Sequence, residues 1–199
     1  MKRLPSLLAL AWAAVQTPTF AADLSRAEDI VKSQCFICHG EQGESSSPAF
    51  PRLAGQNAAY VSRQLADYKS GRRKSSAMQP MVEPLTPDDF PLLGAYFERQ
   101  PTFAHAVDDP ELAQVGRYIY LRGNVDSGVP ACASCHGESG QGTATLPRLA
   151  GQHASYIERQ LKQFGQRERT NDNAVMHAVA SRLTALEARA VASYVSGLK

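Results

Sequence analysis

Two short segments of the chain place a pair of cysteines, separated by two residues, directly before a histidine. They are Cys35-Phe36-Ile37-Cys38-His39 and Cys132-Ala133-Ser134-Cys135-His136. Cys-x-x-Cys-His is the attachment signature of c-type haem. Thiols at this spacing on a helical turn can bind both vinyl groups of one porphyrin edge, and the next residue then projects its imidazole beneath the iron. The sequence therefore predicts two covalent haem c groups. The predicted thioether residues are Cys35, Cys38, Cys132 and Cys135, and the predicted proximal ligands are His39 and His136.

Four cysteines have other uses, namely two disulfides, a zinc site or a redox-active dithiol. A zinc site takes four ligands spread over two loops, whereas each cluster here offers three adjacent groups. A thioredoxin-like dithiol needs a βαβ context, which the sequence pattern lacks. The histidine that follows both pairs is explained only by haem attachment, which we therefore expect.

The surroundings of the two motifs are also repeated. The haem motif recurs after 97 residues, and the hexapeptide Pro-Arg-Leu-Ala-Gly-Gln at residues 51–56 recurs at residues 147–152. Tyr60 and Gln64 likewise match Tyr156 and Gln160. The order is kept while the spacing drifts by one or two residues, so the chain contains a duplicated domain.

A sixth iron ligand must come from downstream of each histidine, and methionine or histidine would saturate the iron. The second copy has Met176, 40 residues after His136. The first copy has two methionines, Met78 and Met81, which follow His39 by 39 and 42 residues.

The internal register of the repeat distinguishes the two methionines of the first copy. Met176 stands seven residues before Leu183, and Met78 stands seven residues before the corresponding Leu85. Met81 aligns with a valine of the second copy. We therefore predict Met78 and Met176 as iron ligands and Met81 as a packing methionine.

Each copy has the pattern of helices joined by loops that contain glycine and proline. Helices are predicted near residues 25–33, 57–70, 110–122 and 154–165. Thr86 and Thr184 are the predicted caps of a last helix in each copy. No alternating strand pattern is present, so the fold class is all-α, with each of two tandem domains wrapped around one haem. The expected domains are residues 22–101 and 110–199, with a linker at residues 102–109.

Some polar residues of the repeat have two interpretations. A carbonyl of Pro51 or Pro147 would accept the Nδ1–H of a proximal imidazole, unless proline and glycine only shape the loop. Four arginines would pair with haem propionates, unless they are structural or solvated charges; they are Arg52, Arg63, Arg148 and Arg159. The run of basic residues 72–74 is interpreted as a solvated face. His105 and His177 are interpreted as ordinary surface or core residues, and His153, at the start of a helix, as a surface residue.

The first residues of the chain indicate an exported protein. Lys2 and Arg3 precede an apolar stretch at residues 4–15 and a small-x-small site at residues 19–21, which together predict a signal peptide over residues 1–21 and a periplasmic location. An uncleaved anchor is the alternative, but the stretch is shorter than the roughly 20 residues of a spanning helix.

The composition of the chain excludes two further classes of protein. Hydrophobic residues are 43% of the 199, which argues against disorder. The net charge of +2 is too small for a nucleic-acid binder.

With these features in place, the chain resembles the di-haem cytochrome c4 family of periplasmic electron carriers. The resemblance covers nearly all of the mature chain and depends on both haem motifs, the paired hexapeptides, the methionine placement and the run Arg169-Thr170-Asn171-Asp172. It implies two cytochrome c-like domains related by a pseudo-two-fold axis. At residues 74–77 the first copy departs from the family pattern, because it lacks the Thr-Asn-Asp run.

The resemblance implies a carrier that takes single electrons from a quinol-oxidising complex toward a terminal oxidase in a respiratory chain, and some family members associate with the membrane. One alternative is a di-haem electron-accepting subunit of a periplasmic dehydrogenase. Another is a haem enzyme, such as a peroxidase or a thiosulfate-oxidising protein. An enzyme needs an open or switchable iron, whereas the matching His-to-Met spacings favour two saturated irons. We therefore expect redox protein partners, no nucleic-acid partner and no enzymatic activity.

Overall fold

The computed structural model describes residues 23–199, and its secondary structure is helical throughout that range. Within it no strand forms, and the one isolated β-bridge joins Asn124 to Val129. The predicted all-α fold is therefore confirmed. The predicted signal peptide, residues 1–21, lies outside the described residues. Between residues 23 and 199, no helix has the length and apolar character needed to cross a membrane.

The first half of the chain forms one helical unit around the first haem motif. Its helix α1 (Ser25–Ile30) continues without a break into the π-helical turn η1 (Val31–Cys35) and then into α2 (Phe36–His39). A π-turn adds one residue to the helical turn, and this one ends at Cys35, the first cysteine of the motif. The chain leaves α2 at Gly40, whose φ of 77° favours glycine. The other helices of this half are α3 (Ala58–Lys69), α4 (Met78–Val82) and α5 (Asp89–Glu98).

The second half repeats this order, with one difference before its haem motif. There α6 ends at Gly123, and a loop closed by the Asn124–Val129 bridge leads to α7. Its helices are α6 (Pro110–Arg122), α7 (Ala133–His136), α8 (Ala154–Gly165), α9 (Val175–Ala180) and α10 (Ala185–Ser196). The observed bounds of α6 and α8 match the predicted ranges, because both helices have the 3.6-residue pattern over three turns. Thr184 forms the predicted capping box with Glu187.

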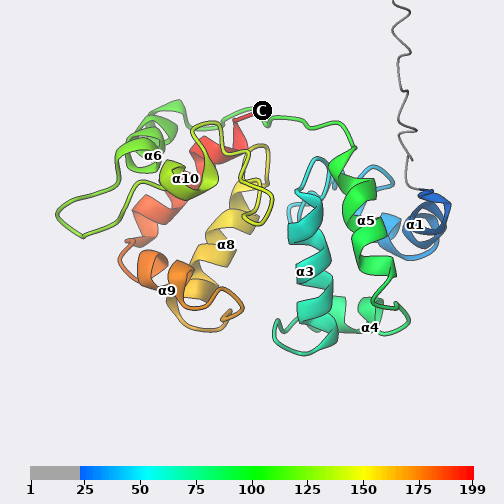
Figure 1. Ribbon diagram of the computed structural model, residues 1–199. Helices are drawn as coiled ribbons and strands as arrows, with labels where there is room; N and C mark the ends of the chain where they lie inside the picture. The colour runs from blue at the N-terminus through cyan, green and yellow to red at the C-terminus, as the bar shows by residue number, and fades with distance from the viewer. Residues whose placement is uncertain (1–22) are drawn as a thin grey trace, which may run out of the picture.

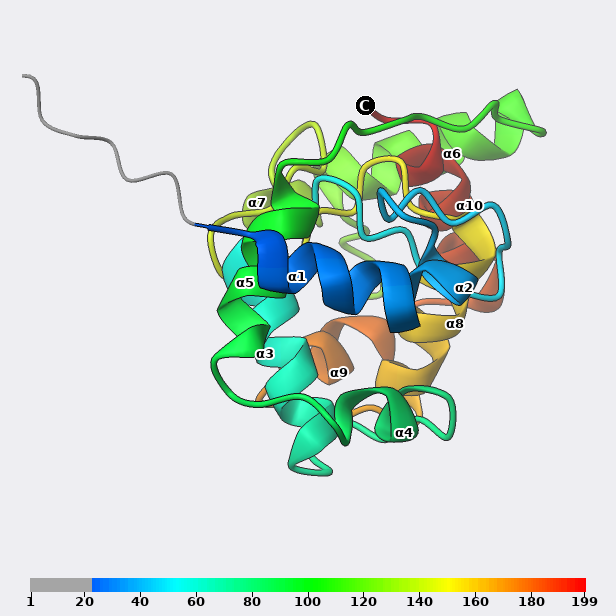
Figure 2. The ribbon, with the colours of Figure 1, turned by 90° about the vertical axis from the view of Figure 1, so that its right-hand side faces the viewer.

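Each half has its own apolar core. In the first half α5 packs against α3 and α1, and in the second half α10 packs against α6 and α8. The cores contain Phe90, Leu93 and Phe97 on one side and Ile119, Tyr120 and Val195 on the other. Figure 1 shows the halves side by side, with α3 and α8 on their inner sides and the segment between α5 and α6 passing over the top. Figure 2 shows α1 crossing the outer face of the first half.

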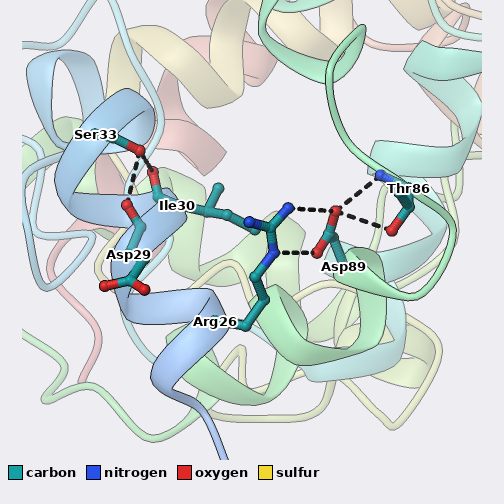
Figure 3. A network of polar contacts seen from close by, with 6 residues as sticks. All are labelled: Arg26, Asp29, Ile30, Ser33, Thr86 and Asp89. Carbon is teal, nitrogen blue, oxygen red and sulfur yellow. Dashed lines mark hydrogen bonds and ion pairs between the residues drawn. The ribbon is translucent and has the colours of Figure 1, made fainter.

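The start of α5 differs from the sequence prediction. Thr86 is the predicted cap, but α5 begins at Asp89, and the Asp89 carboxylate accepts hydrogen bonds from the backbone N–H and the hydroxyl of Thr86 at 2.8 and 3.0 Å (Figure 3). The same carboxylate pairs with Arg26 of α1 at 3.0 Å. The hydrogen bond from Arg26 is the main cause that lowers the pKa of Asp89 to about 2. One buried carboxylate therefore joins α1 to α5.

Candidate haem sites

A single cavity runs through both halves of the molecule. Its volume is about 1430 Å³, larger than the ~300–1,000 Å³ of an ordinary small-molecule pocket. Both haem motifs line it, together with apolar side chains from the two cores, among them Leu93 and Val191. The cavity therefore has the size and the apolar lining that two haems require.

The two motif histidines are buried and oriented in the same way. His39 Nδ1 lies 2.8 Å from the carbonyl oxygen of Pro51, and His136 Nδ1 lies 3.1 Å from that of Pro147. A carbonyl can only accept, so Nδ1 carries the hydrogen and Nε2 keeps its lone pair for a metal. Burial lowers the pKa of both histidines, and the hydrogen bond to proline opposes this only in part. Both imidazoles are thus neutral, as an iron ligand must be.

No disulfide joins the four cysteines of the described chain, so each sulfur is available for a thioether bond. Burial raises the pKa of Cys35 and of Cys132 to about 11, so these thiols are neutral and not reactive thiolates. Within residues 23–199, no cluster of three or more histidine, cysteine or acidic side chains could hold a metal ion. Cysteines without a disulfide partner, beside a large apolar cavity, fit thioether attachment better than a disulfide, a zinc site or a redox dithiol.

The methionines lie on two short helices that the sequence pattern does not predict. Met78 and Met81 are both on α4, and both line the cavity. Met78 is half-buried and packs against the first core, whereas Met81 is 41% exposed. Met176 is half-buried on the matching helix α9 and lines the same cavity. Each of the three therefore shares a cavity with the histidine of its own motif.

A buried arginine that the sequence interpretation missed lies at the boundary between the halves. Arg73 is 8% exposed, and its Nη2 donates to Tyr156 Oη and to Gln160 Oε1 of the other half at 3.0 and 2.9 Å. Its Nη1 donates to Gln64 Oε1 at 2.8 Å. The prediction of a solvated face at residues 72–74 is therefore wrong for Arg73, because its partners come from the second copy.

Arg169 makes the mirror-image contacts from the second half. It donates to Tyr60 Oη and Gln64 Oε1 of the first half, both at 3.0 Å, and to Gln160 Oε1 of its own half at 2.7 Å. Burial alone would raise the pKa of Tyr60, but the charges of Arg169 and Arg73 outweigh it and lower that pKa. Arg73 and Arg169 are 96 residues apart, the offset of the repeated hexapeptide, and this register is the signal that could have found them.

The repeated hexapeptides also contact each other across the boundary. Gln152 Oε1 accepts a hydrogen bond from the backbone N–H of Arg52, and Gln152 Nε2 donates to the Arg52 carbonyl, both at 2.9 Å. Gln56 makes the same pair of bonds with the backbone of Arg148, at 2.7 and 2.9 Å. Both glutamines are 6% exposed. Each glutamine side chain therefore holds the main chain of the other copy, directly after the proline that contacts the motif histidine.

The four arginines considered as propionate partners have structural contacts in three cases. The guanidinium groups of Arg52, Arg63 and Arg159 donate to backbone carbonyls, and each bonds at least one carbonyl of the other half. Arg148 differs, since both its Nε and its Nη2 are buried with no hydrogen-bond partner among residues 23–199, whereas in Arg52 only Nε lacks one. Arg148 lines the cavity, so its free donors suit an anionic group of a bound cofactor.

The remaining histidines are structural. His153 is buried, and its Nε2 lies 2.8 Å from the Ser45 carbonyl of the other half, so the prediction of a surface position does not hold. The ring of His105 packs against that of His153 with centroids 4.7 Å apart. His177 directs Nδ1 to the Phe164 carbonyl at 2.9 Å.

Comparison with known proteins agrees with this geometry. The family model for cytochrome c matches the chain over residues 24–120 and 129–199. Cytochrome c4 of Thiocapsa roseopersicina is 45% identical over 168 residues, which cover 82% of this chain and 86% of the relative. The thiosulfate dehydrogenase electron acceptor of Stutzerimonas stutzeri is 38% identical over 170 residues, which cover 82% and 78%.

A solved structure has the same fold over nearly the whole described chain. The crystal structure of reduced recombinant cytochrome c4 from Pseudomonas stutzeri aligns with a TM-score of 0.84 at 38% identity. The alignment covers 90% of this chain and 100% of that chain. The duplicated helical arrangement is therefore shared as a whole and not only within one half.

Proposed function

Because the chain belongs to the cytochrome c4 family of di-haem electron-transfer proteins, we propose that it is a periplasmic carrier delivering single electrons toward a terminal oxidase. Two covalent haem c groups supply the redox chemistry, since each iron cycles between the ferric and ferrous states. The observation that carries the proposal is the continuous cavity lined by two complete Cys-Cys-His-Met sets. Two redox centres in one cavity allow an electron to pass within the molecule.

We assign the site residues by register and by cavity lining. Cys35 and Cys38 would hold the first haem covalently, and His39 and Met78 would supply its iron ligands. The matching set is Cys132, Cys135, His136 and Met176. A thioether sulfur favours ferrous iron and raises the potential relative to a second histidine. A histidine and a methionine bound to each iron would leave no coordination site for a substrate, so we propose a carrier and not an enzyme.

The partners and the location follow from the same proposal. A quinol-oxidising complex is the proposed donor and a terminal oxidase the proposed acceptor, both at the periplasmic side of a membrane. Residues 1–21 are the proposed signal peptide, which would direct export and then be removed. The proposed domains are residues 22–101 and 110–199, with 102–109 as the linker. Without Lys2 and Arg3, acidic and basic residues are equal in number, so charge steering of partners is weak.

The test is a spectrum followed by a rapid-mixing experiment. The oxidised protein should show the weak far-red band of Met–Fe(III) ligation, with an intensity that corresponds to two haems, and should take up two electrons per chain. The reduced protein should then be oxidised rapidly by membranes that contain a terminal oxidase, and the oxidation should stop with an oxidase inhibitor. A high-spin ferric spectrum would contradict saturated ligation, and failure of the membranes to oxidise the protein would overturn the direction of electron flow.

A second candidate function is favoured by one relative. The Stutzerimonas stutzeri relative is named a thiosulfate dehydrogenase electron acceptor, so this chain would instead accept electrons from one periplasmic dehydrogenase. Mixing the oxidised protein with thiosulfate and a purified thiosulfate dehydrogenase distinguishes the two. Reduction faster than by quinol-oxidising membranes would favour the acceptor role, and slower reduction would favour the respiratory carrier.

A further inference from the structure

One peptide group links the first haem site to the second half of the chain. The carbonyl of the Pro51–Arg52 peptide accepts the Nδ1–H of His39 at 2.8 Å. The N–H of that same peptide donates to Gln152 Oε1 at 2.9 Å. His39 and Gln152 therefore bond to the two ends of a single amide, although they belong to different halves.

The second haem site has the mirror-image arrangement. The carbonyl of the Pro147–Arg148 peptide accepts the Nδ1–H of His136 at 3.1 Å, and its N–H donates to Gln56 Oε1 at 2.7 Å. Both glutamines are fixed, because each is 6% exposed and also donates through Nε2 to the next carbonyl. Two buried glutamines, one from each copy, therefore bond equivalent peptides of the opposite copy.

An amide transmits polarisation from one end to the other. Its C–N bond has partial double-bond character, so a hydrogen bond from the N–H moves electron density toward the carbonyl oxygen. A more negative carbonyl binds the imidazole Nδ1–H more strongly, and this makes Nε2 a stronger donor to a metal. A stronger donor stabilises ferric iron, so it lowers the reduction potential.

We propose that Gln152 and Gln56 are positioning residues that tune the haem of the opposite half through these two peptides. Each glutamine lowers the reduction potential of the other domain's haem and leaves its own domain's haem nearly unchanged. The inference rests on the proposed roles of His39 and His136 as proximal ligands. It goes beyond that proposal because it makes each redox centre depend on a side chain from the other copy.

The test is a crossed pair of substitutions in the haem-loaded protein. Gln152→Met and Gln56→Met keep the length of the side chain and remove its amide. Gln152→Met should raise the midpoint potential of the Cys35/Cys38 haem, and Gln56→Met that of the Cys132/Cys135 haem. The two haems are told apart in a redox titration followed by NMR, with each haem methyl signal assigned through contacts to residues of its own half.

A second readout reports on the histidine itself. In the reduced protein the Nδ1–H proton resonance of His39 should move upfield in Gln152→Met, because its hydrogen bond weakens, while that of His136 should not move. Gln56→Met should give the reverse. A general loss of packing at the domain boundary would shift the signals of both histidines in both variants, so it would not give this reversal between the two variants.

The matched control is another contact across the boundary that avoids both peptides. Asn57 Nδ2 donates across the boundary to the Leu146 and Gln141 carbonyls, and its side chain makes no helix-cap bond. Asn57→Ala should leave both potentials and both Nδ1–H signals near those of the wild type. Equal shifts of both haems in each variant, or a shift of the same-half haem, would overturn the proposal. A wild-type spectrum without His/Met ligation would instead count against the proposed function.

Discussion

Arg73 donates a hydrogen bond across the domain boundary to the hydroxyl of Tyr156, 3.0 Å away. Arg169 donates equally to Tyr60 at 3.0 Å, so the two halves make equivalent contacts through two buried guanidinium groups. Charged hydrogen bonds away from water are stronger than neutral ones, and an unpaired partner is costly. The boundary between the domains is therefore part of the folded core and not a loose contact.

Neighbouring arginines provide the first test. Arg73→Met leaves the Tyr156 hydroxyl without its donor and removes one of the donors to Gln160 and to Gln64, so it should lower the free energy of unfolding by about 3 kcal/mol. Arg72→Met is the matched control, because Arg72 is 66% exposed and its buried partner Asp67 keeps a hydrogen bond from Asn171; its cost should be about 1 kcal/mol. Denaturant unfolding followed by tyrosine fluorescence and haem absorbance measures both. Equal losses in the two variants would contradict a buried role for Arg73.

The second prediction concerns the methionine ligands. Met78→Leu should remove half of the far-red absorption of the oxidised protein, because one of two Met–Fe(III) bonds is lost, and Met176→Leu should remove the other half. Met81→Leu is the control on the same helix and should keep the full band. The measurement is the far-red absorbance of each oxidised variant, compared with that of the wild type at equal haem concentration. If Met81→Leu loses half the band while Met78→Leu keeps it, the register assignment in the first copy is wrong.

A close helix crossing gives the third prediction. A Cβ at Gly116 of α6 would overlap the backbone carbonyl of Ala190 in α10. Gly116→Ala should therefore destabilise the protein by about 2 kcal/mol, although alanine favours a helix. Gly165→Ala, where the nearest atoms lie 3.3 Å from the new Cβ, should change the stability by less than about 0.5 kcal/mol. The measurement is the midpoint of thermal unfolding, and a stabilised Gly116→Ala variant would show that the helices separate easily.

The fourth prediction is a dependence of stability on pH. The pKa of Asp89 is lowered to about 2 in the folded state, below the ~3.9 of an unfolded chain. Its stabilising contribution is thus complete above about pH 4 and is lost as the pH falls toward 2. Asp89→Asn should be less stable at pH 7, by about 1 kcal/mol, and should lose less stability below pH 4.

The control for this prediction is the adjacent carboxylate. Asp88 is exposed, and its side chain makes no cap bond, so Asp88→Asn should follow the wild-type pH curve. Urea unfolding at pH 7 and pH 3 compares the variants. A wild-type curve that is flat from pH 4 to pH 2 would show that the Asp89 contacts do not stabilise the fold.

The haem motifs and the long helices could be predicted from the sequence because they are local. Cys-x-x-Cys-His encodes its chemistry within five residues, and α6 and α8 have a clear helical period over three turns. The short helices α4 and α9 have five and six residues, too few for a period to emerge. The π-turn before Cys35 also has no sequence signature of this kind.

The contacts between the copies could not be predicted from local patterns. Arg73 lies in a basic run that is typical of a surface, and His153 opens a helix at a position where polar residues are common. Both are buried only because the other half packs on them. The duplication did contain a hint, since Arg73 and Arg169 share the offset of the hexapeptides, but it does not say which face of one copy meets the other.

The contact between His153 and the Ser45 carbonyl has a consequence for how such a protein changes over generations. In either half alone this surface would face water, whereas in the whole chain each half covers the surface of the other. A substitution in the loop around Ser45 therefore affects the packing of His153, which lies 108 residues later in the sequence. The sequences of the two halves therefore have to change together where they meet.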